Sequence, residues 1–176
     1  VSQVLANGGV AVLAAAVAVL LRDPARGGLL LSGAFAAAAA DTWSTEWGRA
    51  FGGAPLSLRT FRRVESGRSG AVSAAGLLAS LAGAASVAIA AGLAGVVDGG
   101  LIYAILWAGV IGGFADSLAG AWVQGIWRSA EGRFHETPRD AGPGATLVRG
   151  AAWIRNDAVN AFATVVGASA ACILSG

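Results

Sequence analysis

Long apolar runs alternate with shorter polar connections along the whole chain. Each run is close to or above the roughly 20 residues that an α-helix needs to cross the hydrocarbon core of a bilayer. The connections contain proline, glycine or clustered charges, which end helices. The pattern predicts an all-α integral membrane protein in which residues 1–176 form one domain of about five transmembrane helices. These are expected near residues 3–21, 27–50, 70–97, 100–126 and 152–174.

Composition supports a membrane location. Hydrophobic residues make up 56% of the chain and charged residues 12%, whereas a soluble domain contains roughly 25% charged residues. The 27 glycines and the many alanines allow helices to approach closely in lipid. Every basic residue is arginine. This bias, together with the Ala and Gly content, is typical of a GC-rich genome. The expected location is a prokaryotic cell membrane.

The N-terminal residues and the single cysteine limit how the first helix and the possible sites are interpreted. The sequence contains no methionine, even at position 1, and we expect that its native start is missing. Residues 4–21 lack the basic n-region of a cleaved signal peptide and are interpreted as a spanning helix. Cys172 lies alone in an apolar run, which excludes a disulfide framework and a cysteine-based metal site.

Arginines are concentrated in the second and fourth connections. They are Arg59, Arg62, Arg63, Arg68, Arg128, Arg133, Arg139 and Arg149. The first and third connections contain only Arg22 and Arg26. Because short cytoplasmic loops carry an excess of basic residues, the second and fourth connections are expected in the cytoplasm. Five spans would then place the N-terminus inside and the C-terminus outside.

The acidic and amide side chains within the helices fall near the same face. A charged residue at the centre of a membrane helix costs about 2.5–3.5 kcal/mol on insertion scales, so it needs a partner or a function. The residues concerned lie at the start of the first helix, the end of the second, the end of the fourth and the start of the fifth. They are Asn7, Asp41, Glu46, Asp116, Asn156, Asp157 and Asn160, and the hydroxyl residue Ser44 lies between Asp41 and Glu46.

These residue types favour a hard-cation site. Carboxylates and amides, without cysteine and with a single histidine, suit Mg²⁺ and are poor ligands for zinc. Mg²⁺ usually takes one or two carboxylates and completes its shell with water and phosphate oxygens, which indicates a phosphorylated ligand. Arg63 and Arg68 are suited to phosphate oxygens. Arg68 and Ser69 lie between Gly67 and Gly70 at the start of the third helix, where backbone N–H groups are free for an anion.

Simpler interpretations stand beside this one. The arginines could serve only membrane topology and attraction to anionic lipid headgroups. The aspartates could form structural hydrogen bonds or an ion pair with Arg155. Glu46 lies about 140° around the helix from Asp41, so both cannot point directly at one site. His135 could be a solvated loop residue or a proton donor.

Five segments resemble one known family, in the same order along the chain. They are 3–9 (QVLANGG), 40–48 (ADTWSTEWG), 63–73 (RVESGRSGAVS), 113–120 (GFADSLAG) and 156–160 (NDAVN). They resemble the integral membrane family that contains transmembrane protein nineteen and plant phytyl-phosphate kinase. Members usually begin earlier, so the resemblance implies that upstream ligands are absent or that the full-length form has six spans. It also implies a kinase that converts a prenyl monophosphate to the diphosphate.

The resulting prediction is a Mg²⁺-dependent membrane kinase. It would transfer a phosphoryl group from a nucleoside triphosphate, CTP or ATP, to an isoprenyl or phytyl monophosphate at the cytoplasmic face. Asp41, Asp116 and Asp157 would be catalytic and hold the metal. Substrate and phosphate would be bound by Arg63, Arg68, Ser69, Asn7, Asn156, Asn160, Glu46 and Ser44. The prenyl tail would lie along Gly109, Gly113 and Gly120.

Two other functions remain open. A looser similarity to the Gly-Asp-x-x-Ala signature of dolichol kinase and cytidylyltransferase families favours a CTP-dependent lipid-alcohol kinase or cytidylyltransferase. A non-catalytic transporter or lipid-handling protein is the second alternative, which discontinuous helices and inverted repeats would favour. The expected partners are the isoprenyl monophosphate and membrane lipids. Nucleic acid is not expected, and the chain is compatible with an oligomer.

Overall fold

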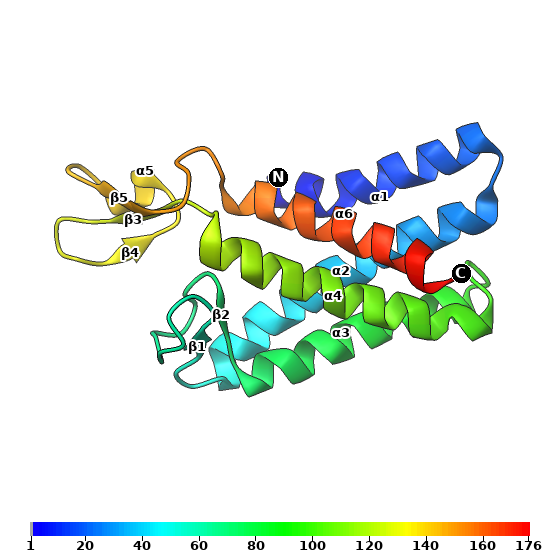
Figure 1. The fold of residues 1–176 in the computed structure, drawn as a ribbon, viewed down its shortest axis with the longest axis horizontal. Coiled ribbons are helices and arrows are strands. Elements are labelled where there is room, and N and C mark those ends of the chain that lie inside the picture. Colours follow the sequence, from blue (N-terminus) through cyan, green and yellow to red (C-terminus); the bar gives the residue numbers. More distant parts are fainter. Residues whose placement is uncertain (1) are drawn as a thin grey trace.

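Five long helices form the body of the protein. The computed structural model describes residues 2–176, with side chains from Asn7 onward except at Leu21, so Gln3 of the first motif lies outside the described side chains. The helices are α1 (Ser2–Leu21), α2 (Pro24–Phe51), α3 (Ala74–Leu93), α4 (Ile102–Trp122) and α6 (Asn156–Leu174). Figure 1 shows them side by side along the long axis of the molecule. The predicted all-α membrane fold is confirmed.

Three of these helices are long and apolar enough to cross a membrane. They cover Ala74–Leu93, Gly99–Trp122 and Asn156–Leu174. The apolar part of α1, Asn7–Leu20, is shorter. The sequence of α2 is long enough to span, but polar side chains toward its C-terminal end make it less apolar than the other helices.

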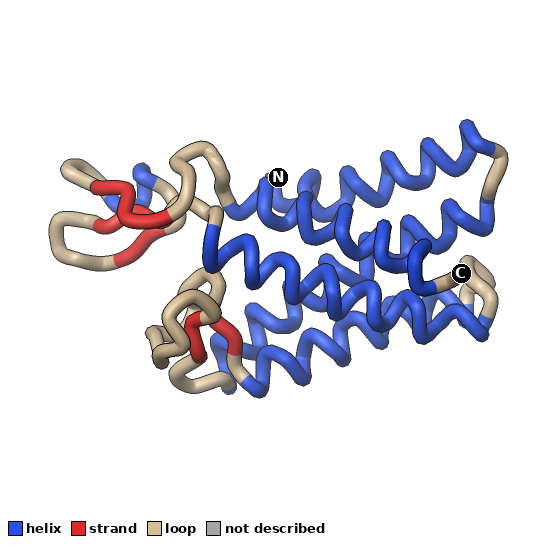
Figure 2. Tube along the Cα trace, viewed as in Figure 1, coloured by secondary structure: helices blue, strands red, loops and turns tan. Residues whose placement is uncertain are grey.

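Two small antiparallel sheets lie beyond the helices at one end of the bundle (Figure 2). The sequence analysis predicted polar connections there and no strands. The first sheet pairs β1 (Leu56–Ser57) with β2 (Ala71–Val72). The second has the order β4-β3-β5, with β3 at Ile126–Arg128, β4 at Phe134–His135 and β5 at Thr146–Arg149. A short helix α5 (Pro138–Ala141) follows β4, and the 3-10 turn η1 (Gly99–Leu101) precedes α4.

The strands make three helices shorter than predicted. Helix α3 begins at Ala74, because residues 71–72 are paired in β2 and the Ser73 hydroxyl caps the helix by accepting a bond from the Gly76 backbone N–H at 3.1 Å. Helix α4 ends at Trp122, since Gln124 leaves the helix to bridge Ala151. Helix α6 accordingly begins at 156 instead of 152.

Helix α2 is the central packing element. It contacts each of the other four long helices. Its buried positions are almost all glycine, alanine or serine, among them Gly33, Ala36, Ala37 and Ala40. Small side chains allow backbones to approach closely, which is how helices associate in lipid, where no hydrophobic force drives them together.

The closest approach within this packing joins α2 to α6. A Cβ atom added at Gly33 would lie 2.5 Å from the Gly167 carbonyl oxygen and 2.7 Å from the Ala171 Cβ. A Cβ added at Gly167 would in turn lie 2.6 Å from the Gly33 carbonyl oxygen. Since backbone atoms cannot move aside cheaply, both positions require glycine.

We predict that Gly33→Ala destabilises the bundle by about 1–3 kcal/mol, because the added methyl overpacks the contact between α2 and α6. Gly9→Ala is the matched control, since a Cβ at Gly9 meets nothing within 4 Å. The measurement is unfolding of the purified protein in detergent. Equal stability of the two variants would contradict the close crossing of α2 and α6.

Candidate functional site

A polar cavity of about 340 Å³ lies at the end of the bundle that carries the strands. Its walls come from the C-terminal halves of α2 and α4, the connection between α2 and α3, the segment after β4 and the start of α6. The lining residues are Asp41, Thr42, Ser44, Thr45, Glu46, Gly48, Arg49, Pro55, Ser66, Gly67, Arg68, Ser69, Gly70, Ala71, Ser73, Asp116, Ser117, Gly120, Gln124, Glu136 and Asn156. Three of the four predicted polar segments therefore converge here, namely the ends of α2 and α4 and the start of α6, whereas the start of α1 does not line the cavity of the described chain.

Two carboxylates from different helices meet in this cavity. Asp41 of α2 and Asp116 of α4 lie within hydrogen-bonding reach of one another. Asp116 Oδ1 is buried and has no hydrogen-bond partner among the described residues. Glu136 lies near enough to act electrostatically on both aspartates. Two adjacent carboxylates repel one another when both are ionised, so they require either a shared proton or a cation.

The turn over the carboxylates is fixed by glycine. Gly67 and Gly70 have positive φ angles of 82° and 74°. A Cβ at Gly70 would overlap the backbone of Ala121, and a Cβ at Gly120 would lie 3.2 Å from the Gly70 nitrogen. The turn that contains Arg68 and Ser69 therefore lies directly on the C-terminal end of α4.

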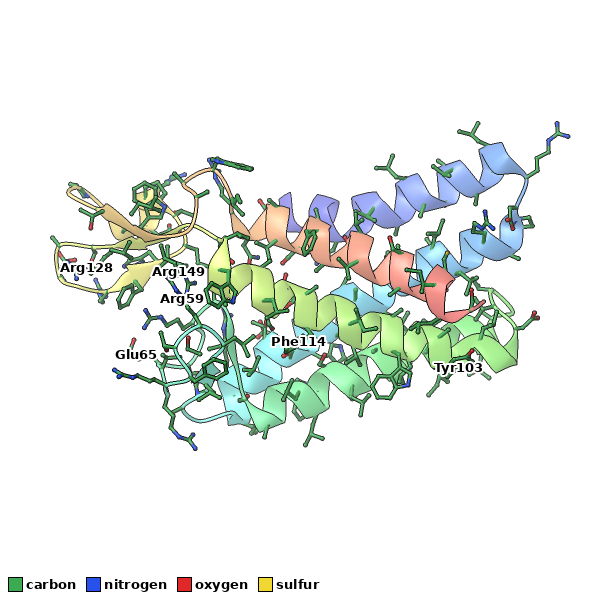
Figure 3. The ribbon with its side chains drawn as sticks, viewed as in Figure 1. Arg59, Glu65, Tyr103, Phe114, Arg128 and Arg149 are labelled. Atoms are coloured by element: carbon green, nitrogen blue, oxygen red, sulfur yellow. The ribbon has the colours of Figure 1, made fainter. Side chains whose placement is uncertain are left out.

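Arg149, in strand β5 of the second sheet, holds this turn against α4 by hydrogen bonds. Its Nη2 donates to the Gly120 carbonyl at 2.8 Å and to the Ser69 carbonyl at 3.2 Å. Partial burial lowers the pKa of the Arg149 guanidinium, and the nearby Arg68 and Arg59 lower that pKa further. Figure 3 shows Arg149 and Arg59 together at the strand end of the molecule. Sequence reasoning counted Arg149 only as a topology signal.

Two residues from the segment around β4, Phe134 and Glu136, contact the turn that contains Arg68 and Ser69. The Ser69 hydroxyl donates a hydrogen bond to the Glu136 carboxylate. The Arg68 guanidinium lies 4.1 Å from the ring centroid of Phe134, a cation–π contact. Sequence reasoning missed Glu136, because its position in a long polar connection gave no sign that this connection folds back over the second.

Two helices begin at the cavity. Ser73 caps α3, and Asn156 is the first residue of α6. The N-terminus of α6 has no side-chain cap within the described part of the chain. Free backbone N–H groups and the positive end of the helix dipole make such a terminus suitable for an anion. Together with the Arg68 guanidinium, these N–H groups provide the cavity with donors that favour a phosphate.

The structure brings together seven of the predicted site residues. They are Asp41, Ser44, Glu46, Arg68, Ser69, Asp116 and Asn156. Glu46 lies at the exposed rim, where its carboxylate is 3.7 Å from Nη1 of Arg49. Sequence reasoning did not select the cavity residues Arg49 and Gln124.

Four predicted site residues are not part of the cavity wall in the described chain: Asn7, Arg63, Asp157 and Asn160. The Arg63 guanidinium donates to the Ala54 carbonyl at 2.9 Å and serves the connection itself. Asn160 is only 3% exposed within the helix packing. Asp157 follows Asn156 by about 100° of helical rotation, so the two side chains leave α6 in different directions.

The three aspartates that the sequence analysis expected to share a metal do not come together. No three Asp, Glu, His or Cys side chains form a metal-binding group within residues 2–176. Asp41 and Asp116 remain adjacent, and one or two carboxylates are the usual protein contribution to a Mg²⁺ site.

The predicted path of the prenyl tail along α4 is also wrong. A Cβ at Gly109 would lie 2.8 Å from the Ala36 Cβ, and one at Gly113 would lie 3.1 Å from the Ala40 Cβ. Gly120 lies under Gly70. These glycines create close contacts with α2 and the polar turn, so no open groove runs along them.

Comparison with known proteins places the chain in a family. No curated protein and no solved structure gives a significant match. The family model described as "Integral membrane protein DUF92" matches residues 1–168, which include both aspartates and every strand. This chain therefore belongs to the integral membrane protein family DUF92, the family of transmembrane protein nineteen and phytyl-phosphate kinase.

Proposed function

We propose that this protein is a membrane kinase that transfers a phosphoryl group from a nucleoside triphosphate, CTP or ATP, to an isoprenyl monophosphate. The observation that carries the proposal is the pairing of Asp41 with Asp116 in one cavity with Arg68 and the open N-terminus of α6. Carboxylates that favour a cation and groups that favour an anion are the two requirements of a metal–phosphate site. Membership in a family that includes a prenyl-phosphate kinase supports the same choice.

Phosphoryl transfer suits these residues because it depends on positioning and charge neutralisation more than on covalent chemistry. A phosphate oxygen of the acceptor attacks the γ-phosphorus of the nucleotide, and the bond from that phosphorus to the bridging oxygen breaks. The products are the isoprenyl diphosphate and a nucleoside diphosphate. No general base is needed, since the attacking oxygen carries no proton at neutral pH. Arg68, Ser69 and the first N–H groups of α6 would orient the phosphates.

The residues present fit a Mg²⁺ ion. Asp41 and Asp116 would hold it, because the buried and unpartnered Oδ1 of Asp116, within the described residues, leaves a carboxylate oxygen free for a ligand. When bound, the ion would neutralise charge on the phosphate oxygens. Glu136 is close enough to add to the negative field that attracts a cation.

The reaction is proposed to take place at the cytoplasmic face of a prokaryotic cell membrane. The cavity lies at the end of the bundle that carries the arginine-rich connections, including Arg59, Arg128 and Arg149 (Figure 3). Basic loops are retained in the cytoplasm, where nucleoside triphosphates are available.

The direct test is a transfer assay on the purified protein in detergent. The protein is incubated with Mg²⁺, each labelled nucleoside triphosphate and farnesyl, geranylgeranyl or phytyl monophosphate. We expect labelled isoprenyl diphosphate, and a chelator should abolish its formation. A CMP–lipid adduct would establish a cytidylyltransferase instead. Absence of transfer by a full-length, folded protein, beside an active reference kinase, would refute catalysis and favour a transport role.

We predict that Asp41→Asn and Asp116→Asn each lower kcat by about 100-fold or more, because each removes one of the two charges that stabilise the cation and the transferring group. Asp157→Asn is the matched control, since Asp157 does not line the cavity of the described chain, and it should retain activity. The measurement is the rate of diphosphate formation at saturating Mg²⁺. An equally damaging Asp157→Asn would overturn the assignment of the pair.

Replacing Arg68 should weaken phosphate binding. Arg68→Ala removes a guanidinium that faces the cavity, and a hydrogen bond to a charged group is worth roughly 10-fold to 100-fold in affinity. We therefore expect KM for the acceptor to rise by this factor. Arg62→Ala removes the same charge from the exposed part of the same connection and is the control. A similar rise in both variants would indicate general attraction to the basic surface.

A further inference from the structure

An apolar groove lies between α2 and α3, next to the polar cavity. Its volume is about 650 Å³. Its walls are formed by alanines and by an equal number of larger apolar side chains, of which Phe35 and Trp43 are 44% and 39% exposed. The groove also contains Ser86, whose hydroxyl is already satisfied by the Gly83 carbonyl at 2.7 Å. Its surface therefore suits a hydrocarbon ligand.

The groove and the polar cavity meet at one residue. Thr42 lines both, and it directly follows Asp41 in α2. From Thr42 the groove continues along α2 to Leu31, and along α3 to Val96 just beyond its end. A polar pocket thus adjoins an open apolar groove between two helices. This arrangement matches a molecule with a charged head and one long apolar chain.

We propose that the groove between α2 and α3 binds the hydrocarbon chain of the acceptor lipid while its phosphate occupies the polar cavity. This inference rests on the proposed kinase function, and it replaces the path along α4 that the close glycine contacts exclude. The chain enters beside Thr42 and extends toward Leu31 and Val96. Asp41 and Thr42 would therefore lie beside the bond that joins the phosphate of the lipid to its hydrocarbon chain.

The length of the groove limits the length of the hydrocarbon chain that it can hold. Thr42 and Leu31 are separated by eleven residues of helix, which correspond to about 16 Å at 1.5 Å per residue. An extended carbon chain advances by about 1.3 Å per bond, as the spacing of 3.8 Å over three backbone bonds indicates. The groove therefore holds about twelve to thirteen bonds. With four main-chain bonds in each isoprene unit, this corresponds to roughly three to four units, the size of a farnesyl to a geranylgeranyl chain.

The position of Ser86 allows the groove to be shortened at its middle. Gly83 packs against Ala39, so Ser86 lies roughly 9 Å from the level of Thr42 along the groove. Ser86 and Ala82 are both exposed residues on α3, but only Ser86 lines the groove of the described chain. A phenylalanine at each position gives a matched pair of variants.

We predict that Ser86→Phe changes chain-length preference. The ratio of kcat/KM for geranylgeranyl monophosphate to that for geranyl monophosphate should fall about 10-fold or more, because roughly half of the longer chain loses its apolar contacts. Ala82→Phe should leave the ratio unchanged. Ala90→Phe, one turn farther along the groove, should lower it less. If the three variants have the same ratio as the parent protein, the groove does not hold the chain.

A second measurement does not depend on catalysis. An alkyl monophosphate carrying a photoreactive diazirine at the end of a chain of about fifteen carbons is bound to the protein and irradiated, and the labelled peptides are identified by mass spectrometry. We expect labelling in residues 31–35 or 90–96, and its loss in Ser86→Phe but not in Ala82→Phe. Labelling confined to other helices overturns the groove assignment. Correct labelling without phosphoryl transfer would refute the kinase activity while keeping the lipid site.

Discussion

The close packing of α2 against its neighbours is the constraint on which the rest of the structure depends. In lipid, van der Waals contact between helices must replace the hydrophobic force that acts in water. Glycine and alanine supply this contact along α2, most clearly where Gly33 meets Gly167. Because α2 and α4 are held this closely, Asp41 and Asp116 are brought side by side. A wider crossing would separate the carboxylates and leave each one buried alone.

The second requirement is a cover over the carboxylates at the end of the bundle. Two connections that are far apart in the sequence supply it, joined by Arg149 and by the bond from Ser69 to Glu136. The pKa of the Arg149 guanidinium is lowered from a very high ordinary value, and the side chain remains well suited to donate to the two carbonyls that it binds. The turn that contains Arg68 and Ser69 is thus positioned by the second sheet as well as by the helices on either side of it.

The sequence was sufficient for the helices and for the face of the bundle where polar groups gather, because apolar length and arginine placement are local patterns. It was also sufficient for Asp41, Asp116 and Arg68, which lie in distinctive segments. It was insufficient for Glu136 and Arg149, since their roles depend on strand pairing between short segments that have little intrinsic preference for strands. Asp157 was selected as the acidic residue at the start of the fifth predicted helix, but it follows Asn156 by about 100° of helical rotation and does not line the cavity of the described chain.

The separation of the paired aspartates along the chain has a consequence for biogenesis. Asp41 is synthesised 75 residues before Asp116. When α2 leaves the ribosome, the helix that completes its carboxylate site does not yet exist. A lone carboxylate is poorly tolerated in a bilayer, so α2 depends on the later helices for stable insertion. The weaker apolar character of α2 supports the same conclusion. Helix α2 is inserted together with the later helices, and its final position is established only when α4 packs against it.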